Sequence, residues 1–239
     1  MIPIVSITDL VLAVLCFGIS AKLFASYKTK PSQLMRYFLA FYLFFGISFL
    51  FFSIPEIFSK HATIITVFNI LAYLSFYLAL AYIAQVPFDL LGKTRLAMGI
   101  FYFAAIFGII FVIMRFVDYH PSVPEIKGSY IFWKPIYASW LRSATGIFSG
   151  ALAIITTIIF YTQGIKHRAN RLVFIRSMWM GTGLLFLLFS SLSTYTLNPA
   201  ALFTPILVST ILAMIGLILI FIGVLYKTEE TIEPSSTLN

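Results

Sequence analysis

The chain has 239 residues, of which 61% are hydrophobic and 10% are charged, and its mean hydropathy is +1.00. A soluble domain carries roughly 25% charged residues, so this composition excludes an ordinary water-soluble protein. The net charge of +8 does not indicate nucleic-acid binding, because no extramembrane domain is predicted that could present a basic face. The single cysteine, Cys16, excludes an internal disulfide and a cysteine-built metal site.

Seven apolar segments follow one another along the chain, each close to the roughly 20 residues that a helix needs to cross a bilayer. They cover residues 9–27, 35–54, 63–84, 96–116, 141–162, 173–195 and 202–225. Helices are predicted rather than barrel strands, because these runs are continuously apolar and do not alternate. The expected fold class is an all-α integral membrane protein with one seven-helix bundle over residues 1–226. A short polar tail over residues 227–239 is expected to be disordered.

The ends of these helices carry local signals. Ser6 and Asp9 have the spacing of a capping box at the start of the first helix. Pro31, Pro55 and Pro87 predict turns after the first, second and third segments. No basic stretch precedes the first apolar run, so we expect a retained helix and not a cleaved signal peptide.

One connection, over about residues 117–140, is longer than the others and is expected to be an outward-facing loop. Its aromatic residues Trp133 and Trp140 are expected to lie at the membrane interface.

The distribution of Lys and Arg predicts the orientation of the bundle. Eleven of these residues follow the first, third, fifth and seventh segments, and five lie on the opposite side. Basic connections face the cytoplasm, which places the N-terminus outside and the C-terminus inside, in the cell (plasma) membrane. The same surplus predicts contact with anionic lipid at the inner face.

Residues for known intramembrane chemistry are missing from the predicted helices. His61, His120 and His167 all fall in connections, and His167 lies on the opposite side from the other two. The last helix has no Lys to hold retinal, and no buried Ser–His or paired carboxylates are expected. We therefore expect no metal, no cofactor and no enzymatic activity.

Polar residues in the outer half of the bundle form the candidate site, because polar groups in lipid are costly and often functional. The candidate pocket comprises Asn69, Tyr73, Tyr77, Arg115, Asp118, Arg142, Ser193 and Tyr195. Arg115 and Asp118 have the spacing of an i, i+3 pair, and Arg115 or Arg142 could hold an anionic group. The alternative interpretation is structural: Ser and Thr bond to backbone carbonyls, and Arg at a helix end anchors it at the interface.

Small residues predict close helix contacts. Ala104 with Gly108 and Gly216 with Gly223 are candidates within the chain, whereas Gly146 and Gly150 are candidates for packing within it or against a second copy. The candidate docking surface for an intracellular partner protein is a basic stretch, which consists of Lys166, Arg168, Arg171 and Arg176. Positive-inside topology alone also accounts for this charge.

Thr8-Asp9-Leu10 opens the first helix and Arg36-Tyr37-Phe38 opens the second. With these residues, its seven spans and its short loops, the chain resembles the seven-helix sensor modules of some bacterial histidine kinases. Seven-helix hydrolases of the ceramidase and adiponectin-receptor type are similar in outline, but their metal-binding histidines have no counterparts here. The first hypothesis is a non-enzymatic receptor or sensor-like module with an outward-facing polar pocket, acting through a partner protein. A small-solute transporter or channel, and a structural subunit of a larger membrane complex, are the alternatives.

Overall fold

The computed structural model describes residues 2–195 and 203–226, so the tail predicted over 227–239 lies outside the described residues. The helices are α1 (Ile4–Thr29), α2 (Gln33–Phe58), α3 (Ala62–Leu90), α4 (Thr94–Val117), α5 (Ser139–Lys166), α6 (Arg171–Tyr195) and α7 (Phe203–Leu225). Two strands, β1 (Val123–Lys127) and β2 (Tyr130–Lys134), lie between α4 and α5. All seven helices are long and apolar enough to cross a membrane, which confirms the prediction of an all-α membrane bundle.

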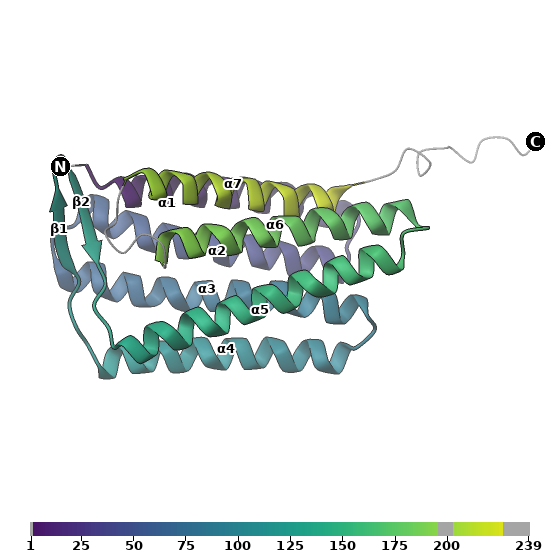
Figure 1. Cartoon of the computed structure of the whole chain (residues 1–239), viewed down its shortest axis with the longest axis horizontal. Coiled ribbons are helices and arrows are strands. Elements are labelled where there is room, and N and C mark those ends of the chain that lie inside the picture. Colours follow the sequence, from purple (N-terminus) through teal and green to yellow (C-terminus); the bar gives the residue numbers. More distant parts are fainter. Residues whose placement is uncertain (1, 196–202, 227–239) are drawn as a thin grey trace, which may run out of the picture.

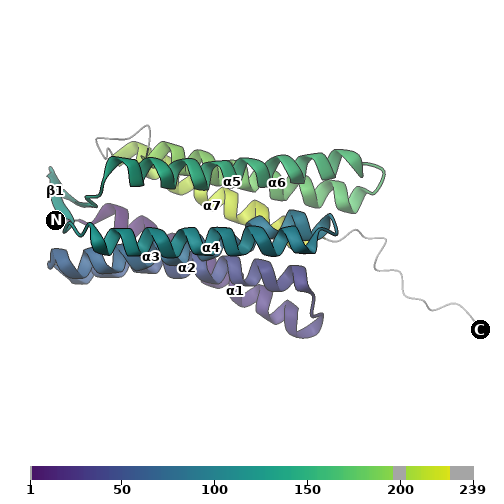
Figure 2. The ribbon, with the colours of Figure 1, turned by 90° about the horizontal axis from the view of Figure 1, so that it is seen from below.

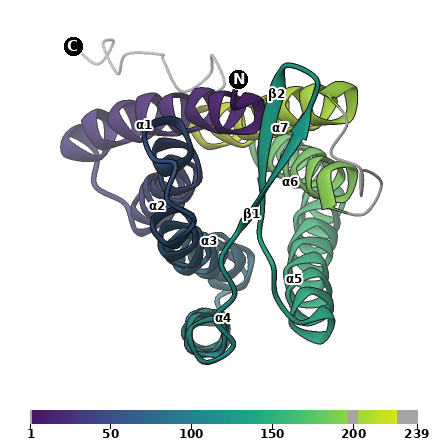
Figure 3. The same cartoon turned by 90° about the vertical axis from the view of Figure 1, so that its left-hand side faces the viewer.

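The helices lie side by side along one long axis (Figure 1, Figure 2). Their packing order is α4, α3, α2, α1, α7, α6 and α5, so most helices contact their neighbours in the chain. The contact of α1 with α7 joins the first and last helices, and α5 also packs on α3. Viewed end-on, α1–α4 and α5–α7 form two groups (Figure 3).

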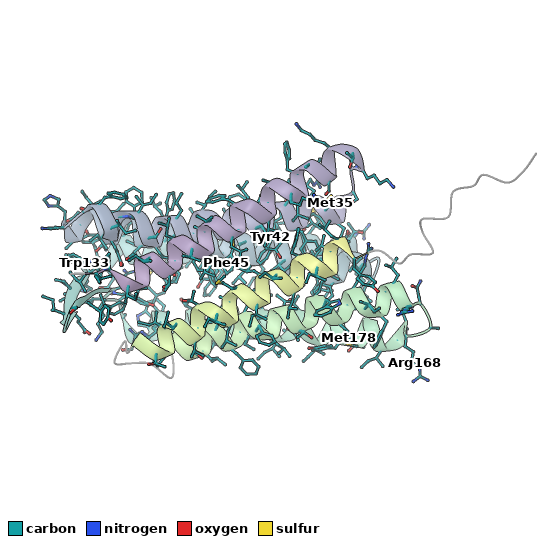
Figure 4. All side chains as sticks on the ribbon, turned by 90° about the horizontal axis from the view of Figure 1, so that it is seen from above. Met35, Tyr42, Phe45, Trp133, Arg168 and Met178 are labelled. Atoms are coloured by element: carbon teal, nitrogen blue, oxygen red, sulfur yellow. The ribbon has the colours of Figure 1, made fainter. Side chains whose placement is uncertain are left out.

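The two ends of the bundle differ. One, here called the hairpin end, carries β1 and β2, whereas the other, the turn end, carries the turns after α1, α3 and α5. Trp133 and Arg168 mark the hairpin end and the turn end, respectively, in Figure 4.

The segment expected to be a loop forms an antiparallel β-hairpin that crosses the end of the bundle (Figure 3). Lys127 pairs with Tyr130, and between them Gly128 adopts a positive φ of 60°, a conformation that glycine reaches without strain. Ile2 extends the sheet, because its N–H donates to Ser129 O at 2.9 Å and its carbonyl accepts from Ile131 N at 3.1 Å. β-branched and aromatic residues on both sides of a glycine turn indicate a hairpin. The expectation of a loop did not take this pattern around Gly128 into account.

The two tryptophans have different environments. Trp133, in β2, is only 7% exposed, so its side chain packs within the protein and its predicted position at the membrane interface stays a prediction. Trp140 is 58% exposed, as a residue at the interface would be.

Three helix-end predictions are corrected. Pro55 and Pro87 lie inside the last turns of α2 and α3, and the helices continue to Phe58 and Leu90. A proline near a helix end removes one backbone donor, yet its own carbonyl still accepts, as in the 2.8 Å bond from Ser59 N to Pro55 O. The predicted capping box is absent, because α1 begins at Ile4 without a side-chain cap.

The main core lies between α1, α2, α3, α6 and α7, where large apolar side chains pack against one another. Phe41 and Tyr42 of α2 pack with Leu217 and Ile220 of α7, and all four are at most 1% exposed. By contrast, α4 and α5 present wide apolar faces to the outside, including Phe103 (63% exposed). Such large exposed apolar surface on long helices fits contact with lipid.

Candidate functional site

The central residue of the candidate site is Arg115, in the last turn of α4 at the hairpin end. Its side chain is fully buried (0% exposed), which is rare for arginine. Nη1 of Arg115 donates a 2.5 Å hydrogen bond to the carbonyl of Ile136, and the guanidinium lies 4.5 Å from the centre of the Tyr137 ring. The carbonyl and the aromatic face together hold the guanidinium in one orientation.

Tyr137, just before α5, connects Arg115 to two other predicted pocket residues. Its hydroxyl lies 3.4 Å from the hydroxyl of Tyr73 on α3. The guanidinium of Arg142, in the first turn of α5, lies 5.7 Å from the same ring. The structure thus brings Tyr73, Arg115 and Arg142 together around Tyr137, which the sequence analysis did not single out. Tyr137 lies in no predicted helix, and no pattern in the sequence points to it.

Several buried polar atoms in this region have no hydrogen-bond partner within residues 2–195 and 203–226. They are Nε and Nη2 of Arg115, Oδ1 of Asn69 and the hydroxyl of Tyr119. Asn69 lies on α3 one turn before Tyr73 and is 8% exposed, and Tyr119 lies four residues after Arg115. Buried polar groups are usually satisfied, so unsatisfied groups in one region of a native protein call for an explanation.

The other predicted pocket residues have different surroundings. Tyr77 lies one turn deeper than Tyr73, where its ring contacts Phe107, Phe111 and Phe148. Asp118 does not form the predicted ion pair with Arg115: its Oδ1 lies 3.0 Å from Nε2 of His120, and its side chain is 44% exposed.

The contribution predicted from α6 is not part of this cluster. Ser193 belongs to α6, which packs on α5 and α7, and one turn earlier Ser190 bonds to Ser209 of α7 at 3.0 Å. The side chain of Tyr195 lies outside the described residues.

A second polar cluster at the hairpin end was missed. The Ser6 hydroxyl on α1 donates a 2.5 Å hydrogen bond to Oε2 of Glu56 on α2, and Asp9 is close enough to Glu56 to interact electrostatically. The sequence analysis did not anticipate that these two carboxyl groups are neighbours. These residues are about 50 positions apart in the chain, and only the packing of α1 on α2 joins them.

At the turn end, Lys166, Arg168 and Arg171 are exposed, as the predicted docking surface requires. Arg176 is committed elsewhere, because its Nε and Nη2 donate to the carbonyl of Tyr226 after α7, at 2.9 and 2.7 Å. These bonds satisfy a carbonyl just past the end of α7, where no further helical turn supplies an N–H donor.

The predicted small-residue contacts divide into two kinds. A Cβ at Gly108 would lie 2.6 Å from Cβ of Tyr77, and one at Gly223 would lie 2.8 Å from Met180, so both positions are close helix contacts within the chain. At Gly146 and Gly150, a Cβ would have no neighbouring atom within 4 Å. The Gly146–Gly150 face of α5 is therefore not used for packing among the described residues.

Within the part of the chain that the structure describes, no group of three His, Cys, Asp or Glu residues lies close enough to hold a metal ion. No protein-family model matches the sequence, and no curated protein is similar to it.

Proposed function

We propose that this chain is a non-enzymatic receptor or sensor-like module of the cell membrane, with its ligand site at the hairpin end. The observation that carries the proposal is the cluster of buried Tyr73 and Arg115 with half-buried Tyr137, which joins α3, α4 and the segment before α5. Polar and charged groups buried in a membrane bundle are costly, and they mark functional sites more often than structural ones.

In this proposal the hairpin end faces outward and the turn end faces the cytoplasm. The surplus of Lys and Arg near the turn end supports this orientation. Exposed Lys166, Arg168 and Arg171 would then contact anionic lipid or an intracellular partner protein that supplies the output.

The unused face around Gly146 and Gly150 supports a second, more limited proposal: contact of α5 with another copy of the chain. Paired glycines four residues apart allow two helix backbones to approach closely. Their open surroundings fit such a contact, whereas Gly108 and Gly223 are already occupied within the chain.

Native mass spectrometry of protein extracted gently from its own membrane tests the receptor-like function. We expect a retained small molecule, which is lost in Asn69→Leu and Arg142→Ala but kept in the control Arg168→Ala at the opposite end. If both pocket variants keep the molecule, the site is not at the hairpin end. If a stoichiometric protein is found in place of a small molecule, the chain is a subunit of a complex and not a ligand receptor.

A further inference from the structure

The Arg115 guanidinium has one hydrogen-bonding edge that the protein does not use. Nη1 is bonded to Ile136 O, but Nε and Nη2 have no hydrogen-bond partner among residues 2–195 and 203–226. These two nitrogens form the side edge of the planar group and carry two parallel N–H donors. Arginine stays charged in proteins, so the edge presents a buried positive charge.

Arg176 provides a comparison within the same chain. Its Nε and Nη2 both donate to Tyr226 O, at 2.9 and 2.7 Å. The same edge is therefore satisfied by the protein in Arg176, which is only partly buried, and not in Arg115, which is 0% exposed. Since an unpaired charge costs more the deeper it is buried, the difference is the reverse of what a purely structural role predicts.

Asp118 is an electrostatic neighbour of Arg115, but no hydrogen bond or ion pair joins the two side chains among the described residues. Asp118, three residues later, instead contacts His120 at 3.0 Å and is 44% exposed. The remaining electrostatic neighbours are the phenols of Tyr73, Tyr119 and Tyr137.

We propose that the Nε and Nη2 edge of Arg115 binds one oxyanion group, either a carboxylate or a phosphate. This inference rests on the proposed receptor-like function and names the ligand class of that site. Two oxygens of such a group match two parallel N–H donors, which is the strongest way for arginine to bind an anion. Tyr119, four residues after Arg115 and just past the end of α4, has a hydroxyl that also lacks a partner in the described part of the chain and would supply another donor.

Binding requires a movement at the hairpin end. Arg115 has no exposed surface, and Ile136 and Tyr137 contact it directly. The segment that joins β2 to α5 must therefore shift to admit the group. The oxyanion belongs either to a soluble molecule or to a lipid head group, because both reach this end of the bundle.

The test measures thermal unfolding of the full-length protein in dodecyl maltoside, which has neither phosphate nor carboxylate. Inorganic phosphate and acetate are titrated at constant ionic strength against chloride. Short-chain phosphatidylglycerol and phosphatidylcholine are titrated separately as head-group probes. We expect at least one of these probes to raise the midpoint temperature of the unaltered protein.

Variants test whether this rise in midpoint temperature depends on the fork of Arg115, that is, the pair of parallel N–H donors at Nε and Nη2. Arg115→Gln should abolish it, and Arg115→Lys, which keeps the charge without the fork, should weaken the apparent affinity about tenfold or more. Arg176→Gln is the matched control: it should lower the midpoint temperature without a probe and leave the shift intact. If Arg115→Gln does not fold, the comparison of Arg115→Lys with the unaltered protein decides.

The outcomes distinguish a soluble ligand from a lipid head group, and they distinguish failure of the oxyanion site from failure of the receptor-like function. A shift with phosphate or acetate indicates a soluble ligand, and a shift with the lipids alone indicates a head group; both support the site. No Arg115-dependent shift with any of the four probes overturns it. If native mass spectrometry then still finds a bound neutral molecule, the receptor-like function stands and only the oxyanion site is rejected.

Discussion

Gly183 of α6 and Gly216 of α7 face each other so closely that neither position has room for a side chain. A Cβ at Gly183 would lie 2.6 Å from Gly216 O, and one at Gly216 would lie 2.7 Å from Gly183 O. Such an approach brings two backbones into direct van der Waals contact, which drives helix association where the surrounding lipid offers no hydrophobic gain.

Gly216→Ala should therefore destabilise the bundle by about 1–3 kcal/mol, because the helices must separate to admit the methyl group. Gly146→Ala is the control, since a Cβ there has no neighbour within 4 Å. The measurement is unfolding by sodium dodecyl sulfate followed by circular dichroism. Equal midpoints for the two variants would show that α6 and α7 are not in this contact.

Tyr42 links the two groups of helices through a buried hydrogen bond. Its hydroxyl, on α2, donates to the carbonyl of Leu217 on α7 at 2.6 Å, and its ring lies in the core beside Phe45 (Figure 4). Tyr42→Phe removes this bond and keeps the ring. We therefore expect the free energy of unfolding to fall by about 0.6 kcal/mol, and by at most about 1.7 kcal/mol. In the same unfolding assay, Tyr102→Phe should change little, because Tyr102 is 55% exposed on α4. A similar effect of both variants would argue against the interhelical bond.

Thr66 of α3 is hydrogen-bonded to Ser122, in the segment just before the hairpin. Its Oγ1 accepts from Ser122 N at 2.7 Å and lies 3.1 Å from the Ser122 hydroxyl. Thr66→Val keeps the shape but leaves the buried amide of Ser122 without a partner, at a cost of about 1–3 kcal/mol. Hydrogen exchange of residues 120–134 should become faster, while Thr162→Val, at an exposed position on α5, should not alter it. Unchanged exchange in Thr66→Val would show that the hairpin is held by other contacts.

The proposed orientation is tested with a membrane-impermeant thiol reagent on intact cells. Ser129→Cys in the hairpin turn should be labelled from outside, and Arg168→Cys at the turn end only after the membrane is opened, because positive connections face inward. The native Cys16 is fully buried (0% exposed) and should not react. The reverse labelling pattern would invert the orientation and place the Arg115 site on the cytoplasmic side.

The hairpin and the helix ends show where sequence reasoning reached its limit. Apolar runs predicted each helix end to within six residues, yet α2 and α3 continue past Pro55 and Pro87. Each proline removes a single backbone N–H near the helix end, so only one intrahelical hydrogen bond is lost there. The segment between α4 and α5 was expected to be a loop. Its strands are short and become stable only through pairing with each other and with Ile2.

The sequence by itself determined that the chain forms seven apolar helices. The hydropathy of about 20 consecutive residues is a local property, and it decides whether a segment is stable in lipid. Only the tertiary structure decided which polar groups meet. Arg115 with Tyr137, and Ser6 with Glu56, come together because of the order in which helices pack and the directions in which side chains leave them. The same holds for glycines. Gly108 and Gly146 each belong to a pair of small residues four positions apart, but Gly108 on α4 packs against Tyr77 of α3, whereas Gly146 on α5 has no neighbouring atom within 4 Å. These contacts join residues distant in the chain, and no local pattern encodes them.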